Sequence, residues 1–305
     1  MSVRKHDAET GGAVDAVAVT AEGFGLKGPR GWAFRGVHVD AAPGSLTAVE
    51  GPSGSGRTCL LLALTGRMKA TEGTASVGGA RLPKQLTAVR RVSAVANVAG
   101  VTDLDPALTV GEHLRERALL QRRFGDSPRG LLRPRAERVR EAKLRIDAAL
   151  GAAGLDREAL PKGVRTAVRD LERLEALRLS VALALISRPR LLGVDDVDLK
   201  LSSTERDEVW ALLRSLAEGG TSVVAVCSEA PEDTVRVALQ RENEGPGPAD
   251  HREPDGHESE DGHETVHEHE HEHEHEHESV HETDVHETET ETEGKADALA
   301  ATRHA

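Results

Sequence analysis

The sequence predicts an α/β fold whose sheet is mainly parallel and covered by helices. Two observations predict it: apolar segments typical of buried strands alternate with segments of helical period, and a glycine-rich loop joins one of these strands to an apolar helix. Residues 14–240 carry this pattern, after a polar and flexible N-terminus at 1–13. From residue 241 the composition changes to Glu, Gly, Pro, His and Thr, which predicts a disordered tail over 241–305.

Each element follows from its own stretch of sequence. Short β segments fill residues 14–50, and the last of them, 45–50, runs directly into the loop. Residues 58–66 are apolar almost throughout, as in a buried helix, and Gly66 is a suitable C-cap. The pattern then predicts helices in 111–150, 164–187 and 203–218, and buried strands in 188–196 and 221–228.

The formal net charge of −13 belongs to the tail. Residues 251–305 hold 19 acidic and 3 basic residues, which leaves 33 acidic and 36 basic residues in 1–250. The folded part is therefore near neutral and has no strong basic field, so we expect no nucleic-acid partner. Two distant cysteines, Cys59 and Cys227, are expected to be free thiols in a reducing cytosol.

Neither a secretory signal nor a membrane-spanning run is visible. Residues 1–12 are polar, and no stretch approaches the roughly 18 uncharged apolar residues that a membrane helix needs. Any link to a membrane is therefore expected to pass through a partner protein.

Residues 51–58, GPSGSGRT, differ by one letter from the phosphate-binding pattern G-x-x-x-x-G-K-[ST]. A strand precedes the loop and an apolar helix follows it, which is the context in which consecutive backbone N–H groups hold phosphate. Thr58 is placed to offer its hydroxyl to Mg²⁺. We expect the nucleotide to contact the loop and the start of its helix, namely Gly51, Pro52, Ser53, Gly54, Ser55, Gly56, Arg57, Thr58 and Cys59.

Arg57 stands where the pattern has lysine. Arginine keeps the positive charge but is bulkier and planar, with donors in a fixed fork. Binding is expected to survive this change, whereas accurate placement of the transferred phosphate is less well served.

A second element, LLGVDD at 191–196, is an apolar strand that ends in Asp195 and Asp196. An aspartate at a strand end beside a phosphate loop holds Mg²⁺, usually through water, so Asp195 joins Thr58 as a predicted metal ligand. The alternative is a strand that stops at a turn with ordinary exposed acids.

Four stretches together resemble the ATP-binding cassette of ABC transporters over residues 14–240. They are FRGVHVDAAPGSLTAVEGPSGSGRT at 34–58, RMKATEGTASVGG at 67–79, PALTVGEHL at 106–114 and VALALISRPRLLGVDDVD at 181–198. The resemblance implies a P-loop NTPase fold with an antiparallel β edge and a helical subdomain at about 105–180, for which the roughly 140 residues between loop and aspartates leave room.

The sequence departs from the family pattern at the positions that serve hydrolysis. The Q-loop glutamine falls on Asn97, the catalytic glutamate on Asp196 and the switch histidine on Ser228. The signature sequence falls on residues 171–175, LERLE, where a carboxylate and bulk replace a serine and glycines. Because that signature serves the nucleotide of a partner cassette, we expect it to complete the partner's site poorly.

Phe24 and Trp32 lie near the place where the family stacks adenine. The alignment does not choose between them, and core packing explains either. In the tail, residues 267–278 read HEHEHEHEHEHE, which is typical of a solvated segment and also permits weak binding of Zn²⁺, Ni²⁺ or Cu²⁺.

The resemblance therefore implies an ATP-binding subunit that uses ATP and Mg²⁺ and docks on a multi-pass membrane protein at the inner face of the plasma membrane. A second ATP-binding subunit, identical or different, is a further expected partner. The departures imply weak or partner-dependent hydrolysis, with Asp196, Ser228 and Asn97 as the candidate catalytic positions. Two alternatives remain: a non-hydrolysing regulatory or scaffold module, and a metal-trafficking GTPase, which the lack of an N-K-x-D element disfavours.

Overall fold

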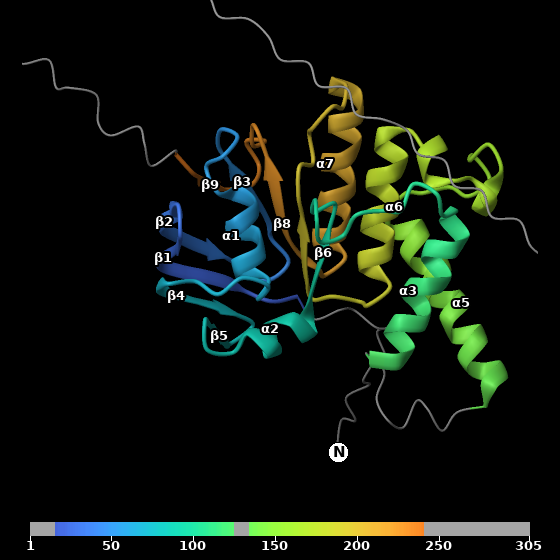
Figure 1. Ribbon diagram of the computed structural model, residues 1–305, viewed down its shortest axis with the longest axis horizontal. Helices are drawn as coiled ribbons and strands as arrows, with labels where there is room; N and C mark the ends of the chain where they lie inside the picture. The colour runs from blue at the N-terminus through green and yellow to red at the C-terminus, as the bar shows by residue number, and fades with distance from the viewer. Residues whose placement is uncertain (1–15, 125–133, 241–305) are drawn as a thin grey trace, which may run out of the picture. The chain divides into compact units, whose positions relative to one another are not determined.

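The computed structural model describes residues 16–124 and 134–240, which form two β-sheets and the helices that cover them (Figure 1). The predicted flexible N-terminus and acidic tail lie outside the described residues. One sheet is antiparallel, in the order β2-β1-β4-β5, and the other is parallel, in the order β6-β7-β8-β3-β9. The strands are β1 (Val19–Gly28), β2 (Gly31–Ala41), β3 (Leu46–Glu50), β4 (Glu72–Val77), β5 (Ala80–Leu82), β6 (Ser93–Ala96), β7 (Leu191–Val194), β8 (Ser222–Cys227) and β9 (Val235–Ala238).

The predicted α/β fold with a mainly parallel sheet and an antiparallel edge is confirmed. The helices are α1 (Arg57–Leu64), α2 (Leu86–Val92), α3 (Val110–Phe124), α5 (Arg135–Ala152), α6 (Arg173–Leu185) and α7 (Ser203–Glu218). The expected helix at 164–187 begins later than predicted. Two short 3₁₀ turns, Gly163–Arg165 and Val168–Asp170, precede α6, because the backbone at Leu171 and Glu172 is extended.

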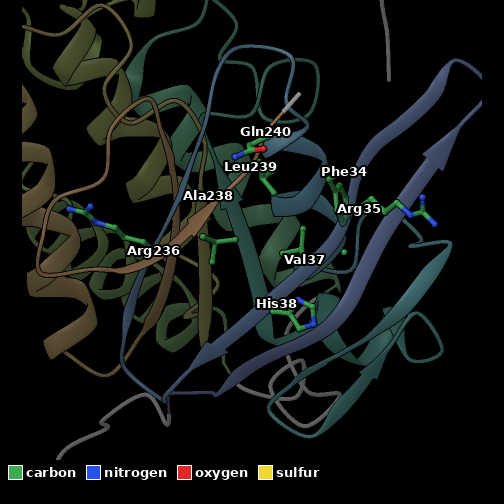
Figure 2. Close-up of a pocket in the computed structure, with 10 residues that line it drawn as sticks. Phe34, Arg35, Val37, His38, Arg236, Ala238, Leu239 and Gln240 are labelled. Atoms are coloured by element: carbon green, nitrogen blue, oxygen red, sulfur yellow. The ribbon is translucent and has the colours of Figure 1, made fainter. Parts of the chain in front are cut away.

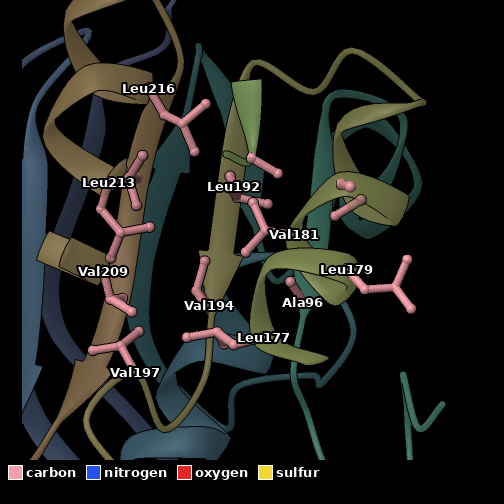
Figure 3. Packing of buried hydrophobic residues seen from close by; sticks show 14 of the residues in the cluster. Ala96, Leu177, Leu179, Val181, Leu192, Val194, Val197, Val209, Leu213 and Leu216 are labelled. Carbon is pink, nitrogen blue, oxygen red and sulfur yellow. The ribbon is translucent and has the colours of Figure 1, made fainter. Parts of the chain in front are cut away.

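The parallel sheet buries both of its faces, in two separate apolar clusters. Along β8, Val223 and Ala225 face the cluster beneath α6 and α7, whereas Val224 and Val226 face α1 and the antiparallel sheet. Figure 3 shows the first cluster, where side chains of α6 and α7 meet those of the strands. Because side chains on both faces of β8 are buried, this strand is a continuous apolar run in the sequence.

The layers bring three strand ends to one place. Strands β3, β7 and β8 are parallel neighbours, so their carboxyl ends, at Glu50, Val194 and Cys227, meet at one edge of the sheet. The glycine-rich loop follows β3, and the two aspartates follow β7. Among the described residues, no helix is long and apolar enough to cross a bilayer.

Candidate functional site

The loop at residues 51–56 connects β3 to α1 in a conformation that requires glycine at its last position. Gly56 is the N-cap of α1 and is left-handed, with φ of 85° and ψ of 14°. A Cβ atom there would lie 1.8 Å from the carbonyl oxygen of Ala33 in β2. The loop is therefore packed directly against the antiparallel sheet, and only a residue without a side chain fits.

Several backbone N–H groups of the loop have no acceptor within the described chain. The N–H of Ser55 donates to the carbonyl of Pro52 at 3.1 Å, but those of Gly54 and of residues 56–58 have no partner among the described residues. The buried hydroxyl of Ser55 also has none there. Unbonded N–H groups at the start of a helix form an anion-binding cradle, and a buried polar atom without a partner is rare unless a ligand or water serves it.

Thr58 and Asp195, the two predicted metal ligands, are hydrogen-bonded to one another. The Thr58 hydroxyl donates to Oδ2 of Asp195 at 2.9 Å, across a sequence separation of 137 residues. Asp195 is only 3% exposed, and its second carboxylate oxygen has no partner among the described residues. Burial raises the pKa of Asp195 to about 6, a rise that the Thr58 hydrogen bond partly opposes.

This donor set suits Mg²⁺. The ion takes oxygen ligands, usually one or two from protein and the rest from water and phosphate, and Asp195 and Thr58 supply such atoms beside the loop. Within the described ranges, no cluster of three or more His, Cys, Asp or Glu side chains suits a transition metal.

Arg57 is turned toward the sheet. Its Nη1 donates to the carbonyl oxygen of Cys227, the last residue of β8. The preceding carbonyl, that of Val226, accepts the N–H of Val197 at 3.0 Å. The guanidinium thus satisfies the backbone carbonyl at the end of β8. The sequence does not predict this contact, because the acceptor is a backbone atom.

Asn97 joins the same group. It follows β6 with φ of 57°, and its side-chain amide donates to the main-chain oxygen of Asp195 at 2.8 Å. Its backbone N–H donates to Ser180 Oγ at 2.7 Å. The amide therefore ties β6 to the residue that follows β7.

Asp196 and Ser228 lie at the same edge of the sheet but are not bonded to one another in the described structure. Asp196 is half-buried and left-handed, with φ of 46°. Ser228 is exposed, and its N–H donates to Oδ2 of Asp198 at 2.7 Å. Asp198, which no sequence motif singles out, thus holds the backbone at the predicted switch position.

Residues 171–175 form the start of α6 and cap it with carboxylates. Glu172 is the N-cap, and its N–H donates to Glu175 at 2.9 Å in a capping box. Arg173 donates to the carbonyl of Leu199 at 3.3 Å. Negative side chains thus occupy a helix N-terminus that would otherwise attract an anion.

The two candidate aromatics differ in burial. Phe24 is fully buried and packs against Phe34, with ring centroids 5.9 Å apart, so it belongs to the core. Trp32 is half-buried, with Arg35 at 4.6 Å and Lys27 at 5.5 Å from its ring. Trp32 precedes Ala33, whose carbonyl oxygen lies against Gly56 of the loop.

Two grooves are lined by residues outside the predicted site. One of about 430 Å³ lies between edge strands β2 and β9, and Figure 2 shows Val37 and Leu239 between the strands, with Arg35 and Arg236 off to either side. It contains none of the predicted site residues. The other, of about 440 Å³, lies between β6, α3 and α6, where Arg67 and Arg117 sit beside Val101 and Leu120.

This geometry agrees with comparisons to known proteins. A family profile described as ABC transporter matches residues 34–198. The chain belongs to the ABC transporter family. The ATP-binding cassette MJ0796, in a dimeric post-hydrolysis state bound to ADP and phosphate, shares the fold with a TM-score of 0.56 at 21% identity, over 73% of this chain and 96% of that one. The cassette cbiO1 of Clostridium perfringens gives 0.56 at 18% identity, over 74% and 88%.

Relatives in sequence include both importers and exporters. The hemin import ATP-binding protein HmuV of Gloeobacter violaceus is 28% identical over 73% of this chain and 78% of its own length. The Nod factor export ATP-binding protein I of Cupriavidus metallidurans is 32% identical over 61% and 54%. The ABC transporter G family member 21 of Arabidopsis thaliana is 33% identical over 60% and 25%. The chain thus spans a quarter to about half of the length of the last two relatives.

Proposed function

We propose that this ABC transporter family member is the ATP-binding subunit of a membrane transport complex. The observation that carries the proposal is the set of unbonded N–H groups in the loop, beside the bonded pair Thr58 and Asp195. Such a cradle suits the phosphates of a nucleotide, and the pair suits Mg²⁺. When bound, Mg²⁺ would neutralise phosphate charge and orient the terminal phosphates.

We further propose that hydrolysis by this chain alone is weak. Asp196 is one methylene shorter than glutamate, and Ser228 lacks the ring nitrogens of histidine. The carboxylates of Glu172 and Glu175 cap α6 at the position that would serve a second cassette's nucleotide. In a closed dimer of identical chains, these carboxylates would face the negatively charged nucleotide of the other chain. This repulsion favours a different cassette as the partner.

The groove that contains Arg67 is the proposed contact with a membrane protein. Val101 is 51% exposed and Leu120 43% exposed at its rim, and large exposed apolar side chains mark interaction sites when they gather. Docking there would hold the chain at the inner face of the membrane. The scaffold alternative shares this surface and differs only in lacking nucleotide turnover.

Calorimetric titration of the purified full chain with Mg-ATP tests the nucleotide site. Thr58→Ala is expected to weaken binding by about tenfold in Mg²⁺ and much less in EDTA, because the hydroxyl acts through the metal. Thr234→Ala, which removes a hydroxyl bonded to Pro231 at 2.8 Å away from the loop, is the matched control.

Phosphate release distinguishes the alternatives. Turnover by the chain alone near the roughly 10 s⁻¹ typical of enzymes would refute weak hydrolysis. Absence of ATP binding at millimolar concentration would leave only a scaffold that uses no nucleotide. Equal binding of GTP and ATP would revive the metal-trafficking GTPase as an alternative.

The proposed binding of transition metals by residues 267–278 lies outside the described residues and is tested separately. Zn²⁺ titration of the full chain and of a chain ending at residue 240 is expected to show binding only in the former. Equal binding by both chains would reject a metal role for the tail.

A further inference from the structure

Arg57 occupies the one position in the loop where the phosphate-binding pattern places a mobile cation. In that pattern the backbone N–H groups hold the α- and β-phosphates, and the lysine reaches the β- and γ-phosphates. Here the guanidinium donates to the main-chain oxygen of Cys227. The two phosphate-binding parts of the loop therefore differ. The backbone N–H groups of the cradle have no partner among the described residues, whereas the Arg57 guanidinium is bonded to Cys227.

We propose that this site recognises the diphosphate part of a nucleotide and distinguishes weakly between nucleoside diphosphates and triphosphates, because Arg57 is committed to the end of β8. The inference rests on the proposed nucleotide site and adds its ligand preference.

The bond between Arg57 and Cys227 opposes a role at the terminal phosphate. Cys227 is fully buried, and removing the guanidinium would leave its carbonyl without that donor. A buried acceptor that loses its partner is costly, so any contact between Arg57 and a terminal phosphate is weakened by about fivefold or more relative to an uncommitted cation. The planar shape of the Arg57 guanidinium weakens that contact further, because its N–H donors cannot be reoriented independently of one another.

The neighbouring side chains do not make up for the loss. The Asn97 amide donates to the main-chain oxygen of Asp195, and the Ser228 N–H is held by Asp198. The Asn97 side chain is thus already bonded to protein, and the Ser228 side chain lacks the ring nitrogens of a histidine. What remains available is the cradle with Thr58 and Asp195, which contacts the phosphates nearest the loop.

The test is a pair of calorimetric titrations of the full chain in Mg²⁺, one with ADP and one with a non-hydrolysable ATP analogue. The two dissociation constants are expected to agree within about threefold. Arg57→Lys, whose ammonium is a compact charge with rotatable donors, is expected to raise the preference for the triphosphate by about fivefold or more. Arg236→Lys is the matched control, because that arginine also donates to a carbonyl, of Pro231 at 3.4 Å, on the edge strand β9.

Each outcome has one meaning. A triphosphate preference above about tenfold in the unmodified chain overturns the inference and leaves the nucleotide site intact. An unchanged preference in Arg57→Lys, in a variant with an unaltered unfolding temperature, overturns the role of Arg57. If that variant does not fold, the ratio measured on the unmodified chain decides the inference alone. Binding of neither nucleotide rejects the proposed function itself.

Discussion

Replacing Gly56 with alanine tests whether the loop is held against the antiparallel sheet. Two effects add at this position. Its left-handed backbone, with φ of 85°, costs any L-residue about 1–2 kcal/mol. The new Cβ would also lie 1.8 Å from the oxygen and 2.6 Å from the carbonyl carbon of Ala33, so β2 or the loop must move. Forced repacking of this kind costs about 1–3 kcal/mol more, for a total of roughly 2–5 kcal/mol.

Gly54 supplies a control with the same backbone strain and no clash. Its φ is 84°, and a Cβ there would meet nothing within 4 Å. Gly54→Ala is therefore expected to lower the free energy of unfolding by only about 1–2 kcal/mol. Gly56→Ala should exceed it by about 1–3 kcal/mol.

Urea unfolding of the two variants and the unmodified chain, without nucleotide, measures the difference directly. Equal destabilisation by the two variants would refute the packing of the loop against Ala33. A Gly56→Ala chain of unaltered stability would refute the left-handed conformation as well.

Three further predictions follow from single groups. Because burial raises the pKa of Asp195 from 3.8 to about 6, its contribution to stability is present below about pH 4 and is lost as the pH rises through about 6. In EDTA, Asp195→Asn should therefore raise the free energy of unfolding by about 2 kcal/mol near pH 8 and change it little near pH 4; a constant difference would contradict this. Burial also raises the pKa of the Cys59 thiol, and that of Cys227 to about 12, so a thiol reagent near pH 8 should modify Cys59 slowly and Cys227 only after unfolding. Glu175→Ala removes the acceptor of the Glu172 N–H, which should lower the free energy of unfolding by about 0.5–1 kcal/mol in a urea titration; no change would argue against the capping box.

The sequence predicts those features whose residues form a recognisable pattern of their own. The apolar runs at β7 and β8 predicted a covered parallel sheet because both of their faces are buried, and the spacing of glycines predicted the loop. Thr58 and Asp195, which the sequence predicts as metal ligands, lie together because the parallel strands that precede them end at one edge of the sheet. The boundary of α6 was predicted too early, because an extended pair at Leu171 and Glu172 leaves no mark in the helical period.

Main-chain partners could not be predicted in this way. The acceptor of Arg57 is the carbonyl of Cys227, and the acceptor of Asn97 is the main-chain oxygen of Asp195. Every residue carries such an oxygen, so the sequence does not indicate which one a side chain will reach. The same holds for the oxygen of Ala33, whose position decides that Gly56 must lack a side chain.

These main-chain bonds change what the departures from the family pattern mean together. Taken singly, arginine for lysine and asparagine for glutamine look like conservative changes in a working site. In the structure, Arg57 binds the end of β8 and Asn97 binds the residue after β7, while Asp198 holds the backbone of Ser228. The ends of β3, β6, β7 and β8 are thus cross-linked by three hydrogen bonds, two of which use the Arg57 and Asn97 side chains at positions that the family pattern assigns to the nucleotide site. A site built in this way has little to rearrange when a nucleotide binds, since its cradle is already formed by the backbone, but it also has few groups left to respond to the loss of a phosphate. The proposed nucleotide binding and the proposed weak hydrolysis therefore rest on the same set of hydrogen bonds.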